Sequence, residues 1–439
     1  MRFLQMIVVS LVVGAFVAQP AAAQDENLPF KIHEAIRTGV NWLKKKQHPQ
    51  EGHFGEASGP TYAAGGTLYP HKAAYTAFAL YCLLKCDVPV TDPVITKGFQ
   101  FLRSSELKGV YEHAVVIMAF RELYHYAVLA YAKRKFEKSK NPETETDKFM
   151  EKLEPGSAAY GMSKLAGAQG QQDWQLVDKL TKKLIGWQNA NQGWRYGDLG
   201  GNDGAQDISA THLALFGLKA SLACNVQFDK GLFAGAATYL LAEQELQGEA
   251  VKQENPGAGS GNKDEGGSWT PMTGDRARGW AYMSGSAKEE EKTRTGGMTA
   301  AALIGLMACK SELMKTPWWK KEGQKVDQAI NDGIAFLNVH WVPNLTSNPP
   351  HGNRTGYFWW AVERTGVLGA VQMIGQHNWY IEGAMNLVAI QQPVDKDNGF
   401  WDIKHEVEPT DLLNTIYALL FLKKTDHAIG IPPVTRGGR

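Results

Sequence analysis

The chain carries almost no net charge and few cysteines, and each shortage excludes a class of function. Its 439 residues include 46 basic and 45 acidic side chains, giving a formal net charge of +1. Without a large field of one sign, nucleic acid is not expected as a partner. The four cysteines form no Cys-x-x-Cys pair, so we predict no zinc site, no other metal and no cofactor. We interpret them as small core residues.

Long apolar runs are also missing. The longest, residues 7–18, is too short to span a bilayer. It follows the basic Arg2 and precedes the small residues Ala21 and Ala23, an order typical of a secretory signal peptide over residues 1–23. We therefore expect an exported chain, periplasmic or secreted, with no transmembrane segment after cleavage. A retained membrane anchor is the alternative.

The chain does contain a six-fold repeat. A threonine is followed at offsets of three, four and seven by a small residue and two large apolar residues, which places all four on one helix face. The copies begin at Thr76, Thr211, Thr299 and Thr415, with looser copies at His113 and Thr355. A leucine, usually preceded four residues earlier by a small residue, marks a second helix before each of these: Leu43, Leu102, Leu184, Leu240, Leu337 and Leu387. Six helix pairs predict an all-α repeat protein.

Loops with a shared signature join the two helices of a pair. Glutamine is followed by glycine and an aromatic residue in Gln47…Gly52-His53-Phe54, Gln188…Gly193-Trp194 and Gln391…Gly399-Phe400-Trp401, and Gly279-Trp280 holds the same place in the fourth pair. The amide can bond loose backbone groups at the helix end, the glycine turns the chain, and the aromatic fills the gap between neighbouring helices.

The pattern predicts one domain over residues 24–430. Two insertions interrupt it: a Lys-, Glu- and Tyr-rich stretch at about 121–172, expected to add helices on the rim, and a loop at about 245–294 with a glycine-rich run at 255–261. Residues 431–439 are expected to form a flexible tail.

The paired helices and Gln…Gly-x-aromatic loops resemble the squalene cyclase and prenyltransferase repeat superfamily over nearly the whole mature chain. The segments 363–368 and 377–384 are also similar to exported bacterial members of unsettled activity. The resemblance implies an α/α toroid of six helix pairs. The threonine helices would form the inner ring and the leucine helices the outer ring, around a cavity that opens where the threonine helices begin.

The superfamily's known motifs are incomplete in this chain. The Asp-x-Asp-Asp-Thr acid motif of class II cyclases falls on Asp207–Thr211, where Ser209 and Ala210 replace the paired aspartates. Alanine cannot protonate an alkene, so ordinary squalene-type cyclisation is not expected. The prenyltransferase Asp-x-Cys zinc motif and the Cys-Gly-Glu-Gln run of complement-like thioester domains are absent as well. A toroid polysaccharide lyase remains possible, because such enzymes use charged residues in the cleft whose spacing along the chain is too variable to recognise in a single sequence.

Asp207 and Asp411 each precede a repeat threonine by four residues and are the candidate catalytic acids, with a helix N-cap or first-turn carboxylate as the alternative. The candidate ligand-binding residues are His212, Arg294, Tyr357, Trp359, Trp360, Glu363 and Arg364. For the aromatic residues and His212 the alternative is ordinary core packing. Glu363 and Arg364 are adjacent on a helix, so we expect their ion-pair partners on neighbouring helices rather than in each other.

Three functions follow. The first is a cavity protein that binds or transforms a hydrophobic or carbohydrate small molecule. The second is a non-catalytic scaffold that binds protein partners in the cell envelope, and the third is a toroid polysaccharide lyase. A scaffold predicts a filled centre and an exposed apolar rim. A cavity protein predicts carboxylates, arginines and aromatic residues converging around a pocket.

Overall fold

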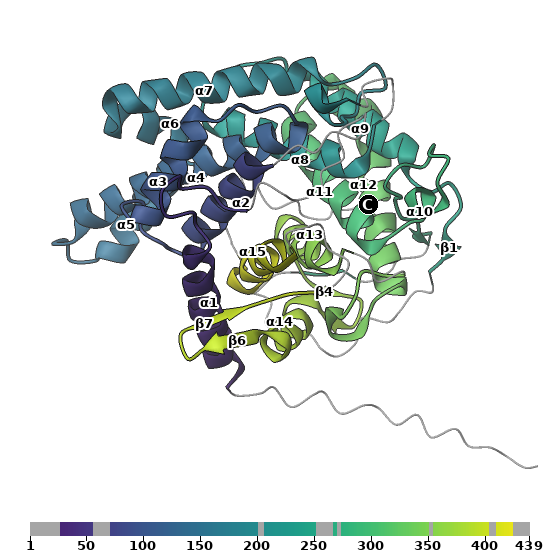
Figure 1. The fold of residues 1–439 in the computed structure, drawn as a ribbon. Helices are drawn as coiled ribbons and strands as arrows, with labels where there is room; N and C mark the ends of the chain where they lie inside the picture. Colours follow the sequence, from purple (N-terminus) through teal and green to yellow (C-terminus); the bar gives the residue numbers. More distant parts are fainter. Residues whose placement is uncertain are drawn as a thin grey trace, which may run out of the picture.

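Six helices form a closed inner ring in the computed structural model, which describes residues 27–55, 71–200, 206–251, 267–269, 274–350, 354–403 and 410–424. They are α2 (Lys72–Lys85), α4 (Val110–Phe136), α8 (Ile208–Ala223), α11 (Gly296–Leu313), α13 (Thr355–Leu368) and α15 (Thr410–Lys423). Each contacts the next in chain order, and α15 contacts α2, which closes the ring (Figure 1). All six contain a repeat anchor, so the predicted inner ring is confirmed.

The leucine-marked helices form the outer ring. They are α1 (Leu28–Lys45), α3 (Pro93–Ser104), α7 (Gly167–Gly186), α9 (Gly231–Glu243), α12 (Pro317–Val339) and α14 (Trp379–Ile390). Outer helices bury one stripe of apolar residues, whereas the inner helices are buried on nearly every side, as expected for a ring enclosed by a second ring. The protein is therefore all-α, an α/α toroid of six helix pairs.

Small residues on the outer helices allow the two rings to approach closely. A Cβ atom on Gly98 would lie 2.6 Å from Leu80, and one on Gly333 would lie 2.7 Å from Leu303. Leu80 and Leu303 occupy the same repeat position, four residues after the threonine. The small residues of these outer helices therefore accommodate the large apolar residue on the inner helix of the preceding pair.

The repeat threonine fixes the loop that enters its helix. The backbone N–H of Trp194 donates to Thr211 Oγ1 at 3.0 Å, and its indole N–H donates to the carbonyl of Leu184 at 2.7 Å. Phe54, Trp280 and Trp401 donate their backbone N–H in the same way to Thr76, Thr299 and Thr415, at 2.8–3.1 Å. Gln188 Nε2 then bonds Leu232 O on the next outer helix at 3.1 Å. Each loop is thus tied to its own inner and outer helices and to the neighbouring pair.

Short elements decorate the rim. The predicted insertion at about 121–172 holds the end of α4, then α5 (Pro142–Leu153), α6 (Ser157–Tyr160) and a π-helical turn (Gly161–Leu165), and α5 projects from the body in Figure 1. Three small sheets pair β1 (Glu249–Ala250) with β3 (Arg276–Ala277), β4 (Val371–Ile374) with β2 (Gly267–Trp269) and β5 (His377–Asn378), and β6 (Gln392–Asp395) with β7 (Asn398–Phe400). The helix α10 covers Glu289–Lys292, and 3-10 turns cover Gly197–Leu199 and Pro343–Leu345. The glycine-rich run, the expected signal peptide and the expected tail lie outside the described residues.

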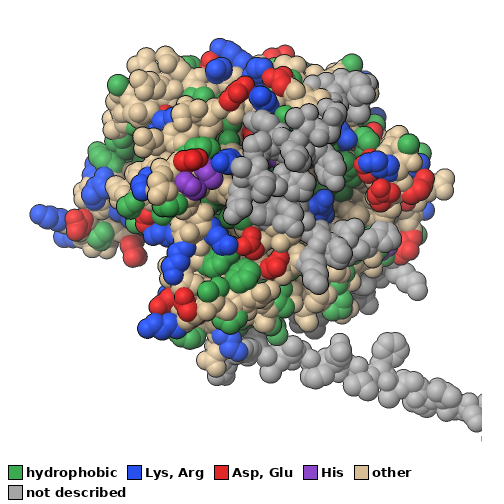
Figure 2. All heavy atoms as spheres, viewed as in Figure 1, with side chains coloured by type: hydrophobic (Ala, Val, Ile, Leu, Met, Phe, Trp, Pro, Cys, Tyr) green, Lys and Arg blue, Asp and Glu red, His purple; other side chains and the backbone are tan. Residues whose placement is uncertain are grey.

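Within the described ranges, none of the helices combines the length and apolar character that crossing a membrane requires. Figure 2 shows acidic and basic side chains intermixed over one face of the molecule, in keeping with the balanced net charge. The four cysteines are free thiols, and Cys82, Cys224 and Cys309 are buried, as predicted for small core residues.

Candidate functional site

Two entry loops converge on the start of α8. Asp207 is the N-cap residue of this helix, and its Oδ1 accepts from the backbone N–H of Ala210 at 2.6 Å. Its own backbone N–H donates to Trp194 O at 3.0 Å, and the next residue, Ile208, donates to Tyr282 O at 3.1 Å. The loops of the third and fourth pairs therefore meet at one helix terminus, at the end of the ring where inner helices begin, which we call the mouth.

The mouth holds a cluster of one carboxylate, one guanidinium and two phenols. Tyr196 and Tyr282 each come two residues after the loop tryptophan of their pair, and their hydroxyl oxygens lie 2.5 Å apart. Arg195 Nη1 donates to Asp207 Oδ2 at 3.0 Å, while its guanidinium lies over the rings of Tyr196 and Tyr282 at 4.4 and 5.4 Å. Tyr282 also donates its hydroxyl to Asp207 Oδ2 at 3.2 Å. We call Arg195, Tyr196, Asp207 and Tyr282 the mouth cluster.

Burial shapes the electrostatics of the mouth cluster. It raises the pKa of Asp207 from 3.8 to about 6, against the opposing effects of Arg195 and of the hydrogen bond from Ala210. The pKa values of Tyr196 and Tyr282 are raised as well, first by burial and then by the charge of Asp207. The phenols therefore stay protonated near neutral pH, and Asp207 is the member of the cluster that exchanges a proton in that range.

Aromatic rings fill the axis of the toroid below the mouth. His212 Nδ1 and the Tyr357 hydroxyl lie 3.0 Å apart, and the His212 ring is 4.8 Å from that of Phe216 and 5.5 Å from that of Trp360. Phe78 and Tyr417 complete the group from α2 and α15. All of these residues are buried. Burial lowers the pKa of His212 to about 3, so the imidazole is neutral. At this level the centre is packed with side chains.

Charged side chains lie farther along the inner helices. Glu363 and Arg364 are fully buried and form an ion pair with each other, so the expectation that adjacent residues do not pair was wrong. The Arg364 side chain is long enough to turn back along the helix, and its guanidinium donates two hydrogen bonds to the carboxylate of Glu363. Arg121 and Glu122 on α4 form the same kind of ion pair, with Arg121 Nη1 2.5 Å from Glu122 Oε1.

The remaining predicted residues lie outside the mouth cluster. Trp359 points its indole N–H at Leu345 O, 2.6 Å away, and packs between helices. Asp411 is partly exposed and pairs with Lys46 at 2.9 Å. Arg294 is exposed and reaches Glu245 at 4.0 Å, while its backbone bridges Ala281, the residue before Tyr282. Asp207 and Asp411 thus share a repeat position but have different surroundings.

Sequence reasoning missed three members of the mouth cluster, Arg195, Tyr196 and Tyr282. The signal that would have found them is their place directly after the glycine and tryptophan of the third and fourth entry loops.

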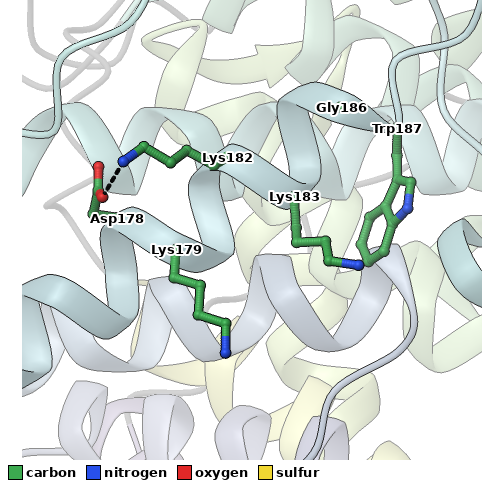
Figure 3. Close-up of a pocket in the computed structure, with 6 residues that line it drawn as sticks. All are labelled: Asp178, Lys179, Lys182, Lys183, Gly186 and Trp187. Carbon is green, nitrogen blue, oxygen red and sulfur yellow. Dashed lines mark hydrogen bonds and ion pairs between the residues drawn. The ribbon is translucent and has the colours of Figure 1, made fainter.

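An open groove of about 590 Å³ lies on the outer helix α7, lined by Asp178, Lys179, Lys182, Lys183, Gly186 and Trp187 (Figure 3). Lys182 pairs with Asp178 at 2.6 Å and Lys183 pairs with Asp198 at 2.9 Å. None of the predicted site residues lines this groove, and we interpret it as ordinary charged surface.

Comparison with known proteins gives a match to a family model and a likeness to solved structures. Residues 9–183 match the family model described as the A-macroglobulin TED domain, a stretch of less than half the chain. No curated protein matches the chain. Among solved structures, an inactive variant of the α-1,6-mannanase GH76A of Salegentibacter sp. HEL1_6, in complex with α-1,6-mannotriose, has a TM-score of 0.47 and 11% identity. The match covers 90% of this chain and 99% of that chain. A likeness of this extent carries no argument about function.

Proposed function

We propose that the protein binds a carbohydrate at the mouth of the toroid, through Arg195, Tyr196 and Tyr282. The observation that supports this most is the paired, partly exposed phenols held against a guanidinium. Sugars are recognised by aromatic faces together with a few fixed polar groups, and the mouth cluster offers both. Asp207 is fully buried and holds Arg195 and Tyr282 in place, so it acts first as a positioning residue.

The aromatic axis favours a carbohydrate over a polyisoprenoid. A long apolar ligand needs a deep apolar cavity, whereas His212, Tyr357 and Trp360 pack against one another on the axis. A lyase that uses a phenolate base is not favoured either, because the pKa values of both mouth phenols are raised. If the bound sugar reacts, Asp207 is the group suited to proton transfer.

We propose that residues 1–23 direct export, that the mature domain covers residues 24–430, and that the toroid is a diverged relative of the squalene cyclase and prenyltransferase superfamily. The signal-type N-terminus and the shared loop signature support these statements.

A scaffold is the second candidate, favoured by the filled axis and by apolar side chains on the rim. Val394 on β6 is 58% exposed, and Met385 and Ile390 on α14 are 37% and 38% exposed. Such side chains are typical of protein contacts when they form one patch.

Binding to immobilised neutral and acidic oligosaccharides tests the carbohydrate proposal. Wild type should retain at least one of them, and Arg195→Met and Tyr282→Phe should each weaken that binding by about tenfold or more, the loss of one well-placed polar contact. Asp411→Asn is the matched control, because this aspartate holds the same repeat position without joining the mouth cluster, and it should bind like wild type. Failure of wild type to retain any sugar, or equal binding by all variants, would favour the scaffold.

A further inference from the structure

The entry loop of the first helix pair carries three potential metal ligands. His48, Glu51 and His53 each offer one ligand atom, and these atoms lie within 4.8 Å of one another. A search for cysteine pairs does not find this group, and the mouth cluster does not include it.

The fold does not require these residue types. The equivalent loop of the third pair has Asn189 and Gln192 in place of His48 and Glu51, and nothing between its glycine and tryptophan where His53 stands. That loop still makes the threonine hydrogen bond, at Trp194. The two histidines and the glutamate are therefore additions to a loop that holds its shape without them.

The backbone of the first loop is firmly held. Gln47 Nε2 donates to Gly52 O at 2.9 Å and to Val94 O at 2.8 Å, and His48 N donates to His53 O at 2.8 Å. Gly52 has a φ of +79°, and a Cβ atom there would lie 2.8 Å from Lys97 O. Ligands on such a loop are pre-positioned, which lowers the cost of binding an ion.

The three side chains already face one another. His53 is 5% exposed, and its Nε2 lies 3.2 Å from Glu51 Oε2. The His48 and His53 rings stack with centroids 4.9 Å apart. His53 Nδ1 is buried with no hydrogen-bond partner among the described residues. His48 Nδ1 accepts from the Glu51 backbone N–H at 3.1 Å, a bond that ligation through this nitrogen would replace.

A cation already lies beside this group. Lys72 Nζ is 3.1 Å from His53 Nε2 and 3.9 Å from Glu51 Oε2. Lys72 is the first residue of α2, where the helix dipole disfavours a positive charge. An ion with stronger bonds to imidazole can therefore displace the ammonium, which is free to rotate outward because Lys72 is only partly buried.

We propose that His48, Glu51 and His53 bind a divalent transition-metal ion, Zn²⁺ above all, in exchange for the ammonium of Lys72. Two imidazoles and one carboxylate suit zinc better than calcium or magnesium, and the fourth position would remain open to water. The ligand atoms must close to about 4 Å or less around an ion with bonds of roughly 2.0–2.2 Å, which side-chain rotation in this loop supplies.

Calorimetric titration of the chelator-treated protein with Zn²⁺ tests the proposal. Wild type should bind one strong equivalent. His48→Gln and Glu51→Gln, both at solvent-accessible positions, should each weaken it by at least about tenfold. Lys72→Met should tighten it, because the competing ammonium is gone. His33→Gln, an exposed histidine on α1, is the matched control and should bind like wild type.

Circular dichroism of each variant separates loss of binding from loss of fold. Absorption of the Co²⁺-loaded protein should show the bands of a low-coordinate nitrogen and oxygen site in wild type and lose them in the His48→Gln/Glu51→Gln double variant. The proposed metal site is refuted if wild type binds no zinc, or if the double variant still binds one equivalent of zinc with the affinity of wild type. Unchanged affinity in Lys72→Met overturns the exchange with the ammonium. Neither result depends on the mouth cluster, so carbohydrate binding is tested separately.

Discussion

Replacing a repeat threonine by valine should destabilise the toroid through one lost hydrogen bond. In wild type, Thr211 Oγ1 accepts the backbone N–H of Trp194 at 3.0 Å, and both residues are fully buried. Valine has nearly the same shape, so Thr211→Val leaves no cavity but removes the acceptor. The N–H of Trp194 then stays buried without a partner.

The expected loss is about 1–3 kcal/mol of unfolding free energy, the desolvation cost of a buried amide left unpaired. Thr299→Val and Thr415→Val should give the same loss, because Trp280 and Trp401 donate to them in the same geometry. Thr211→Ser keeps the acceptor and should lose only about 1 kcal/mol for the missing methyl group.

Urea unfolding followed by tryptophan fluorescence provides the measurement. Thermal midpoints are less suitable, because a chain of 439 residues shifts by only about 1 °C per kcal/mol at an unfolding entropy of roughly 2.1 cal/mol/K per residue. Thr238→Val on α9 is the control: this exposed hydroxyl bonds only Ala234 O of its own helix, so the change should be within about 0.5 kcal/mol. Threonine-to-valine variants no less stable than Thr238→Val would refute the role given to the repeat threonine.

Two further predictions concern the site and the ring contact. Burial raises the pKa of Asp207 to about 6, so its contribution to stability is full below its unfolded value of 3.8 and is lost as pH rises through 6. Asp207→Asn should therefore gain on wild type by about 2 kcal/mol between pH 4 and pH 7 in urea titrations. Parallel profiles for the two proteins would show that the carboxyl is not perturbed. Gly98→Ala should cost about 1–3 kcal/mol in the same assay, because the new Cβ would lie 2.6 Å from Leu80. Gly186→Ala is the control, because nothing lies within 4 Å of the added atom, and its unfolding free energy should be unchanged or rise by up to about 1 kcal/mol. If Gly98→Ala is equally stable, the two rings are less tightly packed than described.

Most of the fold was predictable because each helix pair repeats the same local rules. The offsets of three, four and seven located all six inner helices, and the marker leucines located all six outer ones. The sequence pattern placed the repeat threonine on a helix face but did not identify the hydrogen bond that its hydroxyl makes. Its actual partner is the amide of the aromatic residue in the preceding loop, such as Phe54 for Thr76, which a helix-only reading does not consider.

The candidate site was predictable in part. Counting along α8 selected Asp207, which lies in the mouth cluster, but counting along α15 selected Asp411, which pairs with Lys46 instead. Asp207 and Asp411 hold the same place in their repeats, but their surroundings differ because the side chains around each of them come from other parts of the chain. Arg195 reaches Asp207 from the loop of the third pair and Tyr282 from the loop of the fourth, 75 residues along the chain from Asp207, so only the packing of the ring brings the two loops together.

The sequence by itself determined the periodic part of this protein: helix-forming stretches, their apolar faces and the number of pairs. These follow from short-range geometry, in which residues three and four apart share a face. Only the tertiary structure decided which polar groups meet. Ring closure brings separate loops to one end of the toroid, so the burial of Asp207 and the packing of the axis by His212 and Trp360 depend on contacts between helix pairs.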